Sequence, residues 1–490
     1  MSLRVPSLTI TVLPPETLLE IFTWGNEIEV RDLAFRPFDS FMDPFMDPSF
    51  SKFCLYVASV CRSWRNLVLT TPSLWTNIVI TIDNIEQAKL FLERSSPCPI
   101  SLQVYATLFP QDIISTTMPY FSRLRSLTIK ARSPEEAAVY SDLSSMPLLE
   151  EFCVIIRSRP GADPERDELL YNLIRNVTTL RSLTFKGILP QDFESLSWEN
   201  LSFLNIRRFQ PTYTQFRDLF RRATRLETLY LSTLEGAPDL TDDHQERPPI
   251  EAPSLKYFSV SFGPRHDGTE CRCPLSLLLL NNLETLTVNG NGETSFSLSN
   301  HFSGGRASTS FTKLSKMRLV FINLTTQDVH FFRALNNVCR LELENVGGEL
   351  SLNIAEPFEG LKPLPLLKYV TFRTFGREDL GWLKKRCAIQ ISQLLVEVPR
   401  ALYCDDLVSS APPPLTYRPI DEVNPPYFPY DHDDPWGTGI NEEADDLEYE
   451  DDGFEDYDDH EDYVDYDYYE NYEDYEDYED EDFVEGIYGV

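Results

Sequence analysis

The sequence predicts an α/β protein in which a small N-terminal helical module is followed by an αβ solenoid and a disordered acidic C-terminal tail. Three observations favour this class. Apolar residues follow helical spacing between residues 13 and 76, an apolar motif recurs across residues 77–398, and acidic residues crowd residues 431–490. The 490 residues allow two or three domains, and an apolar content of 42% is enough for a sizeable core.

The first element, residues 13–76, should contain two amphipathic helices. Pro14, Pro15 and Glu16 suit the first turn of a helix, because a missing N–H costs little there and the helix dipole favours negative charge. The apolar stripes are Leu18, Ile21 and Phe22 in the first helix, and Phe53, Val57, Val60, Cys61, Trp64 and Leu67 in the second. Two short helices with this much aromatic bulk cannot bury all of it against each other, so some must face a partner or the next domain.

Four short motifs in this element resemble those of the F-box family. They occur in the family's order as Leu13-Pro14-Pro15-Glu16, Ile21-Phe22, Val60-Cys61-Arg62-Ser63-Trp64-Arg65 and Pro72-Ser73-Leu74-Trp75. In that family the module docks on the Skp-type adaptor of a cullin-based ubiquitin ligase. The resemblance implies that the residues supplying or supporting the docking surface are Leu13, Pro14, Leu18, Ile21, Phe22, Val57, Val60, Cys61 and Trp64.

Residues 25–50 depart from the family pattern, which has only a short turn between the first and second helices. The prolines of this insertion, among them Pro44 and Pro48, rule out a continuous helix, so adaptor docking requires the insertion to loop out. An alternative reading is that the two helices simply cap a larger domain, because aromatic stripes at helical spacing usually belong to a core. The ordered set of motifs favours the docking module.

The motif L-x-x-L-x-L organises residues 77–398. Its clear copies begin 21 to 31 residues apart, at positions 124, 149, 180, 201, 226, 255, 283, 314, 338 and 367, and weaker copies begin at 99 and 391. Alternation within each copy predicts a short strand with one buried face. Helical stripes between copies are predicted at residues 169–177 and 216–223, with further hints at 332–335 and 380–383. The repeating unit is therefore strand, turn, helix.

These copies resemble leucine-rich repeats, although they are degenerate. The ninth repeat position normally holds Asn or Cys, whose side chain bonds the turn backbone, and here only Asn291 conforms. The apolar equivalents include Ile188, Phe209, Leu234, Ile322, Val346 and Phe375. We therefore expect apolar packing to replace the polar ladder and the turns to be irregular. Unrelated α/β strands remain an alternative, because L-x-x-L occurs easily in a Leu-rich chain.

The alternate strand positions should face solvent and form a binding surface for a target protein. Arg, Lys and Tyr are useful at interfaces, although exposed charge alone often serves only solubility. The candidate target-binding residues are Lys130, Lys186, Arg207, Tyr230, Tyr257, Arg318, Arg340 and Arg373.

The chain after the last repeat should not form a packed domain. Residues 399–430 contain the proline runs 412–414 and 425–426 and read as a stiff linker. Residues 431–490 carry 29 acidic and no basic residues, which leaves 49 acids against 43 bases in residues 1–430. Because so acidic a segment cannot bury enough apolar surface to offset chain entropy, we predict a disordered tail.

Composition and motifs exclude several classes. The start of the chain lacks the apolar region of a signal peptide, and no apolar run approaches the roughly 18 residues that a membrane span needs. The scattered, odd set of nine cysteines fits reduced thiols, so we expect a cytoplasmic or nuclear protein. No catalytic motif, metal-ligand spacing or cofactor signature is present; the one close pair, Cys271 and Cys273, is a weak zinc signal. The acidic tail disfavours nucleic acid as a partner.

Together these features predict a non-catalytic substrate receptor of a Skp–cullin–F-box ubiquitin ligase, acting in ubiquitin-dependent protein degradation. On this hypothesis the N-terminal helices bind the Skp-type adaptor, which joins the cullin scaffold, and the repeats bind a protein substrate that the sequence does not identify. The alternative is a ubiquitin-independent scaffold whose acidic tail binds basic proteins such as histones.

Overall fold

The computed structural model describes residues 13–35, 53–105, 110–133, 136–137, 140, 146–156, 177–186, 198–207, 212–234, 248–263, 274–290, 298–302, 311–324, 328–348, 364–373, 393–400 and 415–420. The chain divides into two units, residues 1–435 and 436–490, and every described residue belongs to the first. The tail predicted at residues 431–490 lies outside the described residues, as do most of the predicted helical stripe at 169–177 and all of the one at 380–383.

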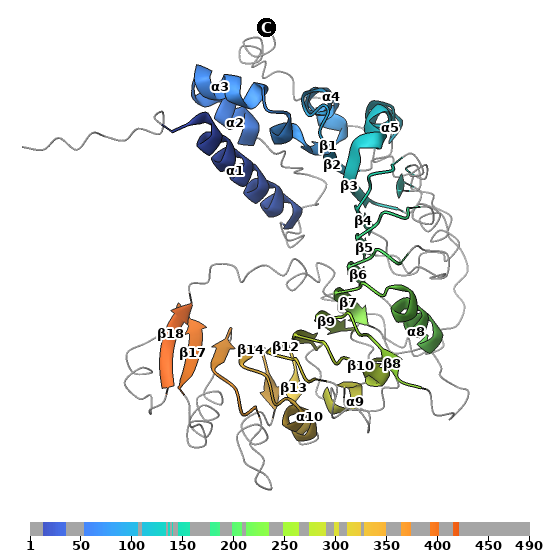
Figure 1. Ribbon diagram of the computed structural model, residues 1–490, viewed down its shortest axis with the longest axis vertical. Helices are drawn as coiled ribbons and strands as arrows, with labels where there is room; N and C mark the ends of the chain where they lie inside the picture. Colours follow the sequence, from blue (N-terminus) through green and yellow to red (C-terminus); the bar gives the residue numbers. More distant parts are fainter. Residues whose placement is uncertain are drawn as a thin grey trace, which may run out of the picture. The chain divides into compact units, whose positions relative to one another are not determined.

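A large parallel β-sheet dominates the described chain (Figure 1) and confirms the α/β class. Its 14 strands follow sequence order, each pairing with the one before it. The strands are β1 (Asn77–Ile80), β2 (Ile100–Tyr105), β3 (Leu124–Ala131), β4 (Glu151–Ile156), β5 (Ser182–Lys186), β6 (Phe203–Arg207), β7 (Thr228–Leu234), β9 (Tyr257–Phe262), β11 (Thr285–Asn289), β12 (Lys316–Val320), β14 (Arg340–Glu344), β16 (Tyr369–Phe372), β17 (Leu394–Pro399) and β18 (Leu415–Ile420). Two small parallel pairs accompany it: β8 (Ile250–Glu251) with β10 (Leu278–Leu279), and β13 (Asn323–Leu324) with β15 (Gly347–Gly348).

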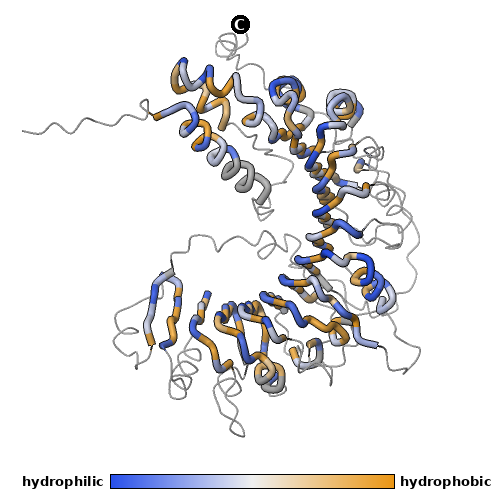
Figure 2. Tube along the Cα trace, viewed as in Figure 1, coloured by the Kyte–Doolittle hydropathy of each residue, from blue (hydrophilic) through white to orange (hydrophobic). Residues whose placement is uncertain are grey.

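Each clear copy of the apolar motif supplies one strand of this sheet, β3 to β16, and the weaker copies supply β2 and β17. The second apolar position of each copy is in register with that of the next, as Leu127 with Phe152 and Phe152 with Leu183. These side chains are buried and form a continuous core, because strand alternation sends them all to one face of the sheet. Apolar and polar residues accordingly alternate along the strands in Figure 2.

Helices fill several of the connections between strands. They are α4 (Ile85–Arg94), α5 (Pro110–Thr117), α8 (Tyr213–Arg222), α9 (Leu298–Phe302) and α10 (Val329–Ala334). The predicted stripe at residues 216–223 lies on α8, which begins with a capping box in which Thr212 and Gln215 satisfy each other's backbone N–H groups. Phe216 and Leu219 of this stripe are fully buried against the sheet's core. The helix therefore packs through the face that its sequence pattern indicates.

The N-terminal helices are α1 (Pro15–Phe35), α2 (Phe53–Val60) and α3 (Arg62–Leu69), followed by the 3-10 helix η2 (Pro72–Trp75). Here the structure differs from the expectation for the insertion, because residues 25–35 continue α1 without a break. Pro37 is the first proline after the helix begins, so the sequence allows the helix to run that far and then stops it.

The sheet extends beyond the predicted end of the repeats. Residues 415–420 were expected to form part of a linker, yet β18 pairs with β17 over six residues, from Leu415 to Ile420. Tyr417 is buried in the core, and Pro419 is tolerated because β18 lies at the edge of the sheet and need not donate to a further strand. The proline run that precedes this strand hid its alternating pattern.

A polar ladder does connect the repeats, but at the turns before the strands rather than at the ninth position. Asn200, Asn282 and Asn337 occupy equivalent turn positions, and each side-chain amide donates to a backbone carbonyl of the preceding repeat, at 3.0, 2.6 and 2.5 Å. Thr179 does the same with its hydroxyl, to the carbonyl of Leu149 at 2.5 Å. At the ninth position itself, Ile322 is buried in the core and Val346 packs against it, as expected, so the polar bonds add to this apolar packing at a different turn.

Candidate functional site

Of the nine residues that the motif resemblance singles out, the N-terminal helices bury three, half-bury three and leave three exposed. Leu18, Phe22 and Val57 are buried, and the Phe22 ring meets the half-buried Trp64 edge-to-face with ring centroids 4.9 Å apart. Cys61 is the N-cap of α3, where its Sγ accepts a hydrogen bond from the Trp64 N–H at 3.5 Å. These five side chains build the helical core and position its surface.

Other apolar side chains of the same helices stay exposed. Ile21 is 45% exposed and Val60 is 60% exposed, as the docking hypothesis requires, while Pro14 is exposed and Leu13 half-buried. Sequence reasoning missed Trp24, which is 73% exposed, and Tyr56, which is 62% exposed. Helical spacing could have found both, because Trp24 follows Ile21 by three residues and Tyr56 precedes Val60 by four.

This exposure is concentrated in one part of the chain. Five of the eleven large exposed apolar side chains in the described residues belong to α1, α2 and α3; they are Ile21, Trp24, Tyr56, Val60 and Leu69. The other six are scattered over the rest of the described chain. Single exposed apolar residues are ordinary, whereas a concentration on three neighbouring helices is typical of an interaction site.

The N-terminal anchor to the sheet is Trp75. Its indole Nε1 donates to the Val68 carbonyl at 2.9 Å, its ring meets Phe91 of α4 edge-to-face at 4.8 Å, and the Arg94 guanidinium lies 4.7 Å from its centroid. The side chain is almost fully buried. Trp75 thus joins α3 to the first strand–helix unit, which holds the exposed surface of the helices on a rigid support.

The second candidate surface is the sheet face opposite the core, here called the outer sheet face, formed by the alternate strand residues. At its β2–β7 end the structure corrects the solvent-facing expectation. Lys130 is buried, with its Nζ donating to the Tyr105 hydroxyl at 3.0 Å and lying 4.8 Å from that ring's centroid. Tyr230 is also buried, against Phe203. Lys186 and Arg207 end β5 and β6, but their side chains lie outside the described residues.

At its β12–β18 end the outer sheet face carries a network of ion pairs between neighbouring strands. Lys316 on β12 pairs with Glu342 on β14 at 3.0 Å. Glu344 of β14 bridges Arg318 at 2.9 Å and Arg373 at 3.6 Å. Arg318 is only 2% exposed, so the expectation that it faces solvent was wrong; a buried guanidinium needs such a carboxylate partner.

Arg340 is the most exposed cation of this network. Its side chain is 41% exposed, its Nη2 lies 3.8 Å from Glu397, and its guanidinium lies 5.3 Å from the centroid of the Tyr369 ring. Glu397 in turn accepts a hydrogen bond from the Thr371 hydroxyl at 2.8 Å. Tyr257 and Tyr369 are both exposed. Among the predicted residues whose side chains the structure describes, Tyr257 and Arg340 are therefore the most accessible to a partner.

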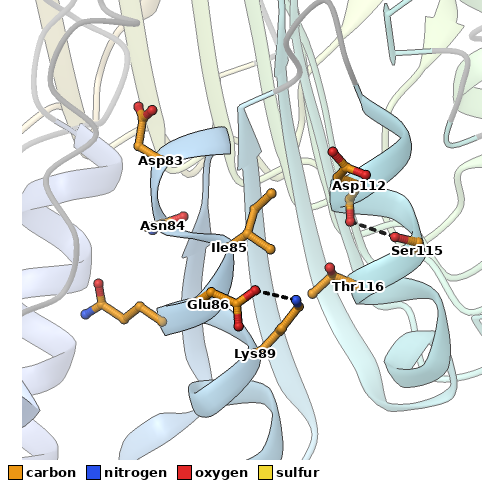
Figure 3. Close-up of a pocket in the computed structure, with 9 residues that line it drawn as sticks. Asp83, Asn84, Ile85, Glu86, Lys89, Asp112, Ser115 and Thr116 are labelled. Atoms are coloured by element: carbon orange, nitrogen blue, oxygen red, sulfur yellow. Dashed lines mark hydrogen bonds and ion pairs between the residues drawn. The ribbon is translucent and has the colours of Figure 1, made fainter. Parts of the chain in front are cut away.

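A shallow groove of about 530 Å³ lies between α4 and α5, where Figure 3 shows Glu86, Lys89, Asp112 and Ser115. Lys89 and Glu86 pair within α4, and Ser115 donates to the backbone carbonyl of Asp112 at 2.9 Å. Within the part of the chain that the structure describes, no three His, Cys, Asp or Glu residues lie where they could hold a metal ion.

No helix among the described residues is both long enough and apolar enough to cross a membrane. No protein-family model matches the sequence, and no curated protein matches it significantly.

Proposed function

We propose that the protein is an F-box substrate receptor with a leucine-rich-repeat-like solenoid, and that it joins a Skp–cullin ubiquitin ligase through α1–α3. The observation that carries the proposal is the concentration of exposed apolar side chains on the helices that also hold the four ordered motifs. Ile21, Trp24, Tyr56 and Val60 have no cover in the structure comparable to that of Phe22, and an adaptor helix would bury them.

The receptor performs no bond chemistry on this proposal. It raises the concentration of a target protein near a ubiquitin-loaded enzyme that other subunits bring. The target would bind the outer sheet face, where Arg340 and Tyr257 are accessible. Because α1 remains helical up to Phe35, adaptor docking has to accommodate a longer first helix than the family pattern.

The test is binding of purified Skp-type adaptor to the full chain. Ile21→Asp and Val60→Asp place a charge on the exposed surface and should reduce adaptor affinity at least tenfold, since a charge buried at an interface without a partner is costly. Met118→Asp is the matched control, because Met118 is equally exposed but lies outside the three helices. Unchanged binding by both α1 and α2 variants would reject the adaptor role.

A ubiquitin-independent scaffold is the second candidate, favoured by the 29 acidic and no basic residues of 431–490. Such a segment attracts basic proteins such as histones by charge alone. The two functions separate cleanly: truncation after residue 430 should abolish histone binding and leave adaptor binding intact, whereas Ile21→Asp should do the reverse.

A further inference from the structure

In three of the described ion pairs of the outer sheet face the cation is more exposed than its carboxylate; the exception is Arg318, whose side chain is 2% exposed against 12% for Glu344. Side-chain exposures are 10% for Glu342 against 21% for Lys316, and 12% for Glu397 against 41% for Arg340. Glu344 likewise lies deeper than Arg373. A molecule approaching this face therefore meets ammonium and guanidinium groups first.

The registered strands place the accessible groups in one row. Each residue of this row is in register with the next on the adjacent strand, in the order Tyr257 (β9), Thr285 (β11), Lys316 (β12), Arg340 (β14) and Tyr369 (β16). Four strand spacings of about 4.8 Å separate the two tyrosines, which is about 19 Å. An extended segment of roughly six residues covers that distance.

We propose that the row from Tyr257 to Tyr369 binds an extended acidic segment of a partner protein, with its carboxylates on Arg340 and Lys316. The inference rests on the proposed function in assigning target binding to this face, and it adds the chemical class of the target. The net charge around the row is positive, which favours an acidic ligand. From β12 to β18 this face carries five cations (Lys316, Arg318, Arg340, Arg373 and Arg418) and three carboxylates (Glu342, Glu344 and Glu397).

Arg340 is suited to be the anchor of this contact. Its 3.8 Å separation from Glu397 exceeds hydrogen-bond distance, so that carboxylate orients the guanidinium without occupying its donors. The Tyr369 ring lies over the guanidinium and restricts the motion of the side chain, which lowers the entropy lost when a carboxylate binds. Exposed Arg and Tyr in contact are the residue types that carry most binding energy at protein interfaces.

The experiment uses the full chain without adaptor and fluorescein-labelled synthetic peptides, read by fluorescence anisotropy. The probes are short peptides of Glu, Asp and Tyr, each matched with a peptide in which Gln and Asn replace the acids. We expect the acidic peptides to bind at least tenfold more tightly than their amide partners, and the difference to shrink with salt. Equal binding of the two sets, or no binding of either, would overturn the proposal.

Arg340→Glu should reduce acidic-peptide affinity at least tenfold, and Tyr369→Ala should reduce it with no change in charge. Arg125→Glu is the matched control, because Arg125 is an exposed arginine paired with Glu150 at 3.0 Å outside the row. Near-UV circular dichroism checks that each variant is folded. A loss with Arg125→Glu as large as that with Arg340→Glu would refute a local site.

The failures of the two proposals are distinguishable. Ile21→Asp should bind acidic peptides normally, because Ile21 lies on α1, and Arg340→Glu should bind adaptor normally. Acid-dependent peptide binding by the unsubstituted protein, together with no adaptor binding or with adaptor binding that Ile21→Asp leaves unchanged, would reject the ligase role alone. Intact adaptor binding without any acid-dependent peptide binding would reject only the assignment of the target class.

Discussion

Ile21 and Phe22 are adjacent in sequence and opposite in burial, which makes them the sharpest test of the helical module. Phe22 is 2% exposed and packs edge-to-face on Trp64, so Phe22→Ala removes a buried ring and leaves a cavity. Such truncations cost about 3–5 kcal/mol. Ile21 is 45% exposed in the folded protein, so it buries only about half of its side chain. Ile21→Ala should therefore lower the free energy of unfolding by about 1 kcal/mol or less.

The assay pairs urea denaturation, followed by tryptophan fluorescence, with calorimetric binding of the adaptor. Phe22→Ala should lower the unfolding midpoint of the helical module strongly. Ile21→Ala should leave the midpoint nearly unchanged and weaken adaptor binding, since its effect falls on the exposed side of α1. Equal destabilisation by the two substitutions would refute the burial argument, and a binding loss confined to Phe22→Ala would refute the docking surface.

Further perturbations probe the sheet. Gly290→Ala should destabilise the protein by about 1–3 kcal/mol, because the new Cβ would lie 2.4 Å from the Phe321 carbonyl oxygen; an unchanged melting temperature would contradict this. Trp75→Phe should cost about 0.5–1.5 kcal/mol by removing the indole hydrogen bond to the Val68 carbonyl, which keeps its bond from the Thr71 N–H; thermal unfolding measures this against the exposed Trp24→Phe. Tyr417→Asp should increase hydrogen exchange in β17 and β18, and unchanged protection there would show that β18 is not paired in solution.

The strand order could be predicted from sequence because each copy of the motif buries its own apolar pair. Leu229 and Leu231, for example, alternate on β7 and pack in register with Phe258 and Val260 on β9. Periodicity is a local signal, and a sheet whose strands pair in sequence order needs little more. Strand β18 was not predicted, because its alternating pattern is short and follows several prolines. Prolines usually indicate a loop in a sequence, but they are tolerated in a strand at the edge of a sheet.

The outer sheet face was less predictable for a physical reason. Alternation correctly places Lys130, Arg318 and Arg340 on one face, but it does not determine which of them is covered. Exposure there depends on lateral partners such as Tyr105 and Glu344, which lie about 25 residues away in sequence. Likewise the ladder through Asn200 depends on a carbonyl in the preceding repeat, a contact that a nine-position repeat pattern does not predict.

The buried ion pair of Arg318 bears on why this face has charges at all. Replacing a buried pair by apolar groups of similar volume is often neutral or stabilising, so Arg318 and Glu344 are weakly justified by stability alone. Glu344 also lies 3.6 Å from Arg373, so it supports a second cation while neutralising the first. A sheet that needed only a stable core could have used apolar residues at these positions, as it does at Val320 on the neighbouring position of β12. Lys316 and Arg340, which are more exposed than the carboxylates that pair with them, are instead what recognition of an acidic partner requires, because orientation and charge are set before the partner arrives.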